Sequence, residues 1–162
     1  MLSPMRMFVV LLAVMASQVF GADLSRKDAP ALKAVKSYAN SIGCAVNLDE
    51  RNVVPYEIDG ESVAVTLYSI DLGCSGGTAM SRPAFAVVRQ NVYGAYVDPR
   101  YSSPLQTSEE FPQHTERLFA RHGQLWYSGK EFNFETDALC CPSIRVEGKV
   151  QFREGKWVNE PK

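Results

Sequence analysis

Short runs of β-branched and aromatic residues, separated by turn dipeptides, fill most of the chain after residue 53. Runs of this kind, bounded by glycine-containing turns, are typical of antiparallel strands joined by hairpins. The predicted strands cover residues 53–58, 63–70, 85–89, 92–97, 118–120, 125–127, 143–147, 150–153 and 157–158. The predicted turns are Asp59-Gly60, Gln90-Asn91, His122-Gly123, Glu147-Gly148 and Glu154-Gly155. The chain is therefore predicted to fold mainly as antiparallel β-sheet.

The predicted strand at residues 63–70 has a regular alternation of side chains between its two faces. One face carries Val63, Val65, Leu67 and Ser69, and the other carries Ala64, Thr66, Tyr68 and Ile70. Both faces contain apolar residues, and we expect each apolar face of a sheet to be covered by another element.

A helix is predicted between Asp28 and Gly43. Asp28 is a suitable N-cap, Pro30 is favoured in a first helical turn, and Gly43 is a natural end. Apolar residues recur at a spacing of three and four and form one face of this helix, namely Leu32, Val35, Ala39 and Ile42. The opposite face is polar, so the helix is expected to lie with one side on a flat partner.

The predicted fold class is α+β, with the N-terminal helix packed on a curved, mainly antiparallel β-sheet and the whole stapled by disulfides. The sheet is expected to contain roughly six to eight strands. A β-sandwich with an added helix is the alternative arrangement. Residues 98–113 are rich in proline, serine and charge and show no clear period, so an exposed loop is expected there.

The first 21 residues have the organisation of a secretory signal peptide. Arg6 supplies a positive charge, and residues 8–16 form an apolar run that is shorter than the about 20 residues needed to cross a bilayer. Cleavage is expected after Gly21, which leaves residues 22–162 as a single exported domain in the periplasm or outside the cell. Because no cysteine follows the apolar run closely, we expect no membrane anchor after cleavage.

The chain has four cysteines, all in the predicted mature domain: Cys44, Cys74, Cys140 and Cys141. An even number of cysteines in an exported protein predicts disulfide bonds. The pairing that joins Cys140 to Cys141 is ranked last, because neighbouring side chains of an extended segment point to opposite faces. Each of these two cysteines is predicted to pair with Cys44 or Cys74, in an order that stays open.

The segment Gly73-Cys74-Ser75-Gly76-Gly77-Thr78 resembles the nucleophile loop of trypsin-like serine proteases. It departs from that family at Cys74, where the family has aspartate. One alternative function is therefore a small envelope hydrolase in which Cys74 or Ser75 acts with His114 or His122. The structural interpretation is a tight glycine turn that holds a disulfide cysteine. The tight local spacings of a zinc module are absent, so no metal site is predicted.

The segment Asp137-Ala138-Leu139-Cys140-Cys141-Pro142-Ser143 resembles the Asp-x-x-Cys-Cys-Pro-Ser element of small, largely uncharacterised bacterial exported proteins and lipoproteins of the LppP/LprE kind. The resemblance covers about residues 71–153 and includes the turn around Cys74. It implies an exported β-rich module and supplies no catalytic residues. The chain departs from the lipoproteins because it has no cysteine for lipid attachment.

The charge balance is nearly even, with 17 basic and 18 acidic residues, so no basic surface for nucleic acid is predicted. No cofactor is expected. The leading functional prediction is a non-enzymatic exported binding protein whose partner is another envelope protein. The role considered for such a protein is inhibition of a cell-wall hydrolase or immunity against a toxin. A cell-wall-associated structural module is a further alternative.

The loop at residues 98–113 is the expected binding element, because long loops on a rigid scaffold often carry function. Exposed aromatic side chains suit recognition, since they offer a large contact area at little entropic cost. The predicted binding residues are Tyr96, Tyr101, Glu109, Glu110 and Phe111. No catalytic residue is predicted beside them.

Overall fold

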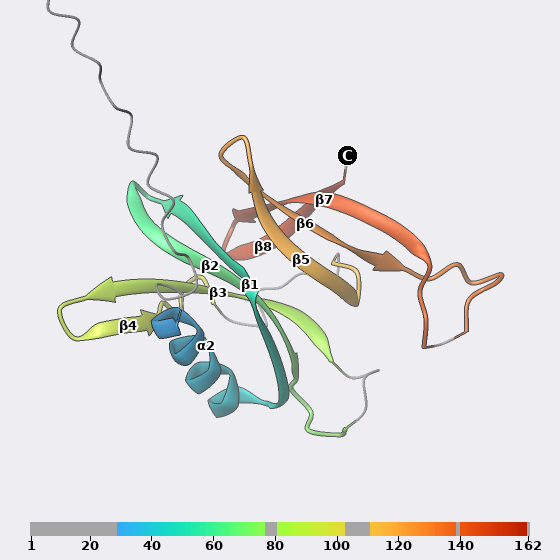
Figure 1. Cartoon of the computed structure of the whole chain (residues 1–162), viewed down its shortest axis with the longest axis horizontal. Helices are drawn as coiled ribbons and strands as arrows, with labels where there is room; N and C mark the ends of the chain where they lie inside the picture. The colour runs from blue at the N-terminus through green and yellow to red at the C-terminus, as the bar shows by residue number, and fades with distance from the viewer. Residues whose placement is uncertain (1–28, 77–80, 103–110, 139, 162) are drawn as a thin grey trace, which may run out of the picture.

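The computed structural model describes residues 29–76, 81–102, 111–138 and 140–161 (Figure 1). Within these residues one helix, α2 (Ala29–Ile42), is followed by eight strands. The strands are β1 (Cys44–Ile58), β2 (Glu61–Asp71), β3 (Arg82–Asn91), β4 (Gly94–Val97), β5 (His114–Arg121), β6 (Gln124–Glu131), β7 (Ile144–Arg153) and β8 (Lys156–Pro161). The predicted signal peptide lies outside the described residues. No helix in the described ranges is both long enough and apolar enough to span a membrane.

The strands form two antiparallel sheets of four strands each. Sheet A has the order β1-β2-β3-β4, and sheet B has the order β5-β6-β7-β8, so strands that pair are also consecutive in the chain (Figure 1). The helix and the antiparallel strands agree with the predicted fold class, whereas the strands form two sheets in place of the one sheet predicted. Strongly twisted sheets tend to split into packed pairs, because each sheet then buries an apolar face against the other.

The inward faces of the two sheets share one apolar core. Sheet A contributes Val54, Val63, Val65, Leu67, Phe85 and Val87, and sheet B contributes Leu118, Leu125, Tyr127, Val150 and Trp157. The rings of Phe85 and Trp157, one from each sheet, lie 5.4 Å apart between centroids. Full burial of an aliphatic or phenyl side chain contributes roughly 1.5 to 3 kcal/mol, so this core is the main source of cohesion between the sheets.

Helix α2 covers the other face of sheet A (Figure 1). The helix buries Ala31, Val35 and Ala39 against Tyr68, Ile70, Ala84, Ala86 and Val88 of the sheet. Small side chains on both surfaces let the helix approach closely. The predicted end of the helix before Gly43 is confirmed, whereas the predicted cap Asp28 lies outside the described residues. Ala31 takes the buried position expected for Leu32.

Strand β2 lies between β1 and β3 and is covered on both faces. Val65 and Leu67 face sheet B, and Tyr68 and Ile70 face the helix. The predicted alternation along this strand is therefore confirmed, and β2 separates the two apolar clusters.

Three of the five predicted turns are confirmed, at Asp59-Gly60, His122-Gly123 and Glu154-Gly155. Both residues of each turn have positive φ, which is the conformation of a two-residue type I′ hairpin. Asparagine, aspartate and glycine tolerate this conformation best, so dipeptides ending in glycine mark such turns in the sequence.

The other two predicted turns are wrong. The turn expected at Gln90-Asn91 lies two residues later, because Asn91 pairs with Gly94 and leaves Val92-Tyr93 at the tip. Glu147-Gly148 lies within β7, not in a turn. Gly148 is needed there because the ring of Tyr127 covers it, and a Cβ atom on Gly148 would lie 2.6 Å from Tyr127 Cε1.

The disulfide pairing differs from the prediction. Cys44 pairs with Cys74, and Cys140 pairs with Cys141. Cys44 begins β1 opposite Asp71, the last residue of β2, so a short turn is enough to bring Cys74 to it. Neighbouring side chains point apart in an extended segment, but the amide of Cys141 donates to the carbonyl oxygen of Ala138, so the chain turns there and the two cysteines can pair.

Candidate functional site

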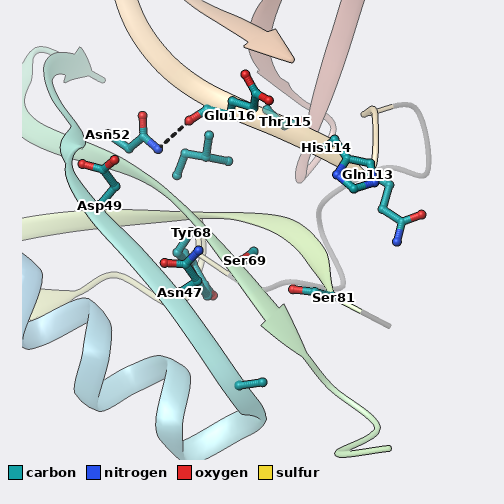
Figure 2. A pocket seen from close by; sticks show the side chains of 12 residues that line it. Asn47, Asp49, Asn52, Tyr68, Ser69, Ser81, Gln113, His114, Thr115 and Glu116 are labelled. Carbon is teal, nitrogen blue, oxygen red and sulfur yellow. Dashed lines mark hydrogen bonds between the residues drawn. The ribbon is translucent and has the colours of Figure 1, made fainter. Parts of the chain in front are cut away.

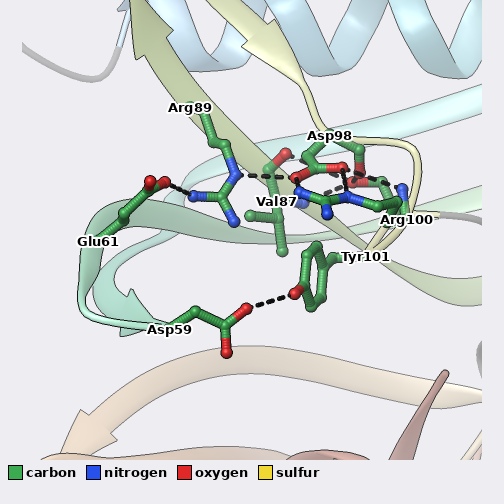
Figure 3. Close-up of polar contacts among 8 residues, drawn as sticks. Asp59, Glu61, Val87, Arg89, Asp98, Arg100 and Tyr101 are labelled. Carbon is green, nitrogen blue, oxygen red and sulfur yellow. Dashed lines mark hydrogen bonds and ion pairs between the residues drawn. The ribbon is translucent and has the colours of Figure 1, made fainter. Parts of the chain in front are cut away.

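Tyr101 is held by contacts from both sheets, of which Figure 3 shows the hydrogen bond to Asp59. Its hydroxyl donates to Asp59 at 2.6 Å, and its carbonyl oxygen accepts from the indole of Trp157 at 2.7 Å. Its ring packs against Phe152, with 4.7 Å between ring centroids. The hydrogen bond to Asp59 is the main reason why the pKa of Tyr101 is raised. These contacts stabilise the junction of the sheets and leave Tyr101 little freedom to contact a partner.

A buried ion pair lies beside Tyr101 (Figure 3). Nε of Arg89 donates to Asp98 at 2.8 Å, and the two side chains are only 10% and 6% exposed. Arg89 also pairs with Glu61, and Arg100 approaches Asp98 from solvent at 3.2 Å. Burial opposes ionisation of Asp98, but hydrogen bonds from Arg100 and Arg89 outweigh it and lower the pKa of the carboxyl group. The network fixes the turn after β4.

Phe111 lies in the core between the sheets and is 6% exposed. Its ring is 5.0 Å from that of Phe85. Glu109 and Glu110 lie outside the described residues. Of the predicted binding residues that the structure describes, Tyr96 is the most exposed, at 43%.

Tyr96 lines a groove between helix α2 and strand β4, called the α2–β4 groove below. The groove has a volume of about 510 Å³, and Tyr38 and Tyr93 also line it. Tyr93 is 95% exposed at the tip of the β3–β4 turn. Lys33 is the only charged side chain among the described residues of the lining. The sequence alone does not single out Tyr93, because a turn at Gln90-Asn91 would put it on a strand.

A larger hollow, the inter-sheet cleft, lies where sheets A and B diverge (Figure 2). Its volume is about 660 Å³. The wall on the side of sheet A includes Asn47, Asp49, Ser69 and Ser81, and the wall on the side of sheet B includes His114 and Glu116. A ligand in this cleft would contact both sheets.

Asn52 closes one end of the inter-sheet cleft (Figure 2). Its Nδ2 donates to the carbonyl oxygen of Glu116, and its Oδ1 accepts from the amide of Leu118, both at 3.0 Å. The side chain thus bonds to the edge of β5 as a neighbouring strand would. Strands β1 and β5 both shift register near this point. No local signal marks Asn52, because Leu118 is 66 residues away in the chain.

Both carboxylates of the inter-sheet cleft have a cationic partner. Arg51 Nε donates to Asp49 at 3.0 Å, and the hydrogen bonds from this guanidinium are the main reason why the pKa of Asp49 is lowered to about 2. Glu116 lies 3.1 Å from Nζ of Lys130. In the described part of the chain, no group of three or more His, Cys, Asp or Glu side chains is arranged to hold a metal ion. The charges of Asp49 and Glu116 are therefore each balanced by a basic side chain.

The turn after β2, which resembles a nucleophile loop, is closed by a buried carboxylate. Asp71 is 1% exposed and accepts from the amides of Gly73 and Gly76 at 3.0 and 2.9 Å. The disulfide from Cys74 to Cys44 ties the same turn to the start of β1. This geometry is that of a structural turn.

The candidate catalytic residues are not assembled into a site. Cys74 is in a disulfide, so it offers no thiolate. Ser75 donates to the carbonyl oxygen of Gly73, and no described hydrogen bond joins it to His114 or His122. The two histidines are also apart, since His114 begins β5 and His122 lies in the turn that follows it.

A second carboxylate-closed turn lies in the β6–β7 loop of sheet B. Oδ2 of Asp137 accepts from the amides of Asn133 and Ser143, both at 2.8 Å. These hydrogen bonds, that of Asn133 first, lower the pKa of Asp137. The first and last residues of the Asp-x-x-Cys-Cys-Pro-Ser element are therefore bonded to each other, which gives a physical reason for this spacing.

The fold and these surfaces define a class, a disulfide-stapled domain of one helix and two antiparallel sheets, whose hollows include the inter-sheet cleft and the α2–β4 groove. No known protein family, curated protein or solved structure matches the chain. The resemblance carried by residues 137–143 stays a prediction. The function is therefore inferred from the geometry of the surfaces.

Proposed function

We propose that this protein is a non-enzymatic exported binding protein that captures another envelope protein along strand β4 and the α2–β4 groove. The partner class is a cell-wall hydrolase or a toxin, which the captured state would inhibit. The observation that carries the proposal is the edge of sheet A at β4, whose four residues include no proline and no charged side chain.

The four edge strands of the two sheets differ in how they discourage pairing with other chains. Natural edges are protected by proline, charges and bulges. β1 contains Pro55 and a register shift, β5 has a register shift beside Glu116, and β8 begins with Lys156 and ends with Pro161. β4 contains no proline, charge or register shift in its four residues. An extended segment of a partner could therefore add to this edge as a further strand.

The tyrosines around β4 supply the contact area that such a short strand cannot. Tyr93 and Tyr96 are 95% and 43% exposed, and Tyr38 reaches the same groove from helix α2. Tyrosine is enriched among the residues that contribute most to protein interfaces. Lys33 in the lining favours an acidic side chain in the bound segment, because complementary charges raise specificity.

The cysteines support an extracytoplasmic location for this function. Both disulfides would persist in an oxidising compartment, in agreement with the export signal predicted at residues 1–21. Cell-wall hydrolases and incoming toxins act in the same compartment. A rigid domain without an assembled catalytic group suits inhibition by binding.

The test is a pull-down with the mature protein, residues 22–162, from an envelope extract of the organism that makes it. Wild type is compared with Tyr93→Ala/Tyr96→Ala. Loss of both rings is expected to weaken capture by about tenfold or more, because interface tyrosines often contribute more than about 1 kcal/mol each. Wild type should lower the activity of a captured hydrolase or toxin, and the double variant should not.

Phe134→Ala is the matched control, because Phe134 is also 95% exposed but lies in the β6–β7 loop. It should capture the partner as wild type does. Equal capture by the tyrosine double variant would rule out the α2–β4 groove, and absence of any partner would remove the proposed function. Point variants are preferable to deletion of residues 101–112, because Ser102 and Phe111 are buried.

A further inference from the structure

A row of aromatic side chains leads from the inter-sheet cleft to the surface. His114, on the wall of the cleft, packs edge-on against Phe132 with 5.5 Å between ring centroids. The ring of Phe132 is 6.2 Å from that of Phe134. Phe134 is 95% exposed, so it adds nothing to the core and leaves its ring open to solvent. The row therefore begins at the wall of the cleft and ends at the solvent-exposed ring of Phe134.

The loop that carries Phe134 is fixed on both sides of it. Asn133 Oδ1 accepts from the amide of Glu135 at 3.1 Å, and the carbonyl oxygen of Asn133 accepts from the amide of Asp137 at 2.8 Å. Asp137 in turn holds the amide of Ser143. The hydrogen-bonded backbone of this turn therefore holds Phe134 in its exposed position.

Next to the aromatic row, the inter-sheet cleft offers neutral hydrogen-bonding groups. Asn47 and Ser69 lie on the wall of sheet A, Ser81 lies before β3, and Leu67 adds an apolar contact. The two carboxylates of the cleft are already paired with cations. Amides and hydroxyls both donate and accept, which is what sugar hydroxyls require, and the C–H faces of sugars pack on flat aromatic rings.

We propose that the inter-sheet cleft and the row formed by His114, Phe132 and Phe134 bind a neutral oligosaccharide. One sugar ring packs on Phe134, and the next sugars enter the cleft, where Asn47 and Ser69 bind their hydroxyl or acetamido groups. This site is separate from the α2–β4 groove and does not depend on the protein partner. Bound to a cell-wall glycan, the protein would stay where wall-directed enzymes act.

The probes are chitohexaose, a soluble β-1,4-linked oligomer of N-acetylglucosamine, and cellohexaose, which has the same linkage without acetamido groups. Each is titrated into the isotope-labelled mature protein, and amide shifts are followed by NMR. Shifts are expected around Asn47, His114 and Phe134 with at least one sugar. Phe134→Ala and Asn47→Ala should each weaken binding by about fivefold or more, as expected for one stacked ring or one well-placed hydrogen bond.

Tyr93→Ala is the matched control, because Tyr93 is equally exposed at 95% but lines the α2–β4 groove. It should bind the sugar as wild type does. No shifts with either sugar at millimolar concentration, or wild-type affinity of Phe134→Ala, would overturn the proposal. Shifts in the cleft with an extended peptide and with neither sugar would also overturn it. Since Tyr93→Ala and Phe134→Ala should affect different ligands, failure of this site is distinguishable from failure of the protein-binding function.

Discussion

Two turns of this protein share the spacing Asp-x-x-Cys, at residues 71–74 in sheet A and at residues 137–140 in sheet B. In each turn the aspartate accepts two backbone amides, and the cysteine forms a disulfide. The turns differ in burial and in what the disulfide joins. Asp71 is 1% exposed, and Cys74 reaches Cys44, 30 residues earlier. Asp137 is partly exposed, and Cys140 joins its neighbour.

One local pattern therefore serves two purposes, depending on its place in the fold. The first turn ties the end of β2 to the start of β1, directly after helix α2. Packing is tight there, since a Cβ atom on Gly43 would lie 2.9 Å from the carbonyl oxygen of Asp71. The second turn shapes a surface loop that presents Phe134. We expect changes in the first turn to affect global stability, and changes in the second to affect local order and ligand binding.

The largest effect is expected from Cys44→Ser/Cys74→Ser. This disulfide closes a loop with a sequence separation of 30 residues. Its loss should lower the free energy of unfolding by about 3 to 4 kcal/mol in the chain-entropy model. Denaturant unfolding followed by tryptophan fluorescence measures the change. An unchanged midpoint would contradict the assignment of this disulfide as the main staple of sheet A.

Asp71→Asn should have the next largest effect. The side-chain amide cannot accept from both Gly73 and Gly76, so one hydrogen bond to the carboxylate is lost, and the free energy of unfolding should fall by about 1 to 3 kcal/mol. Thermal unfolding measures the difference. Asp49→Asn is the control, because the side chains of Arg51 and Asp49 are 66% and 33% exposed and loss of such a pair should cost less than about 1 kcal/mol. Equal losses of stability in Asp71→Asn and Asp49→Asn would contradict the structural role assigned to the buried carboxylate of Asp71.

Cys140→Ser/Cys141→Ser should change global stability little. The disulfide joins adjacent residues, so it constrains the unfolded chain by about 1 kcal/mol or less. Hydrogen exchange of amides in residues 133–143 should become faster, and binding of the sugar probe should weaken. A loss of stability as large as that expected for the other disulfide would make the two turns equivalent.

The smallest effect concerns the titration of Asp137. Its folded-state pKa is lowered below the ordinary 3.8, mainly by the amide of Asn133, so the unfolded state binds the proton more tightly. The stabilisation is therefore present above pH 4 or so and is lost as the pH falls through the lowered pKa. NMR titration of the Ser143 amide should give a midpoint below 3.8. A midpoint at or above that value would contradict the hydrogen-bonded turn, and Asp137→Asn should abolish the transition.

Features set by a few neighbouring residues could be predicted from the sequence. The ends of helix α2 follow from Pro30 and Gly43, and three hairpin turns follow from dipeptides whose glycine accepts positive φ. Gly148 was misleading as a turn signal, because its role is to admit the ring of Tyr127 from another strand. Of the predicted binding residues, Tyr96 is exposed, whereas Phe111 is in the core.

Local sequence patterns account for three backbone features of this protein: the amphipathic helix, the alternation of β2 and the tight hairpins. Long-range contacts account for three others: the division of the eight described strands into two sheets, the partners of the four cysteines and the junction at Asn52. Backbone preferences act over a few residues, so they can be read locally. Sheet membership and disulfide partners depend on contacts between residues far apart in the chain, and the same Asp-x-x-Cys spacing therefore leads to two different outcomes.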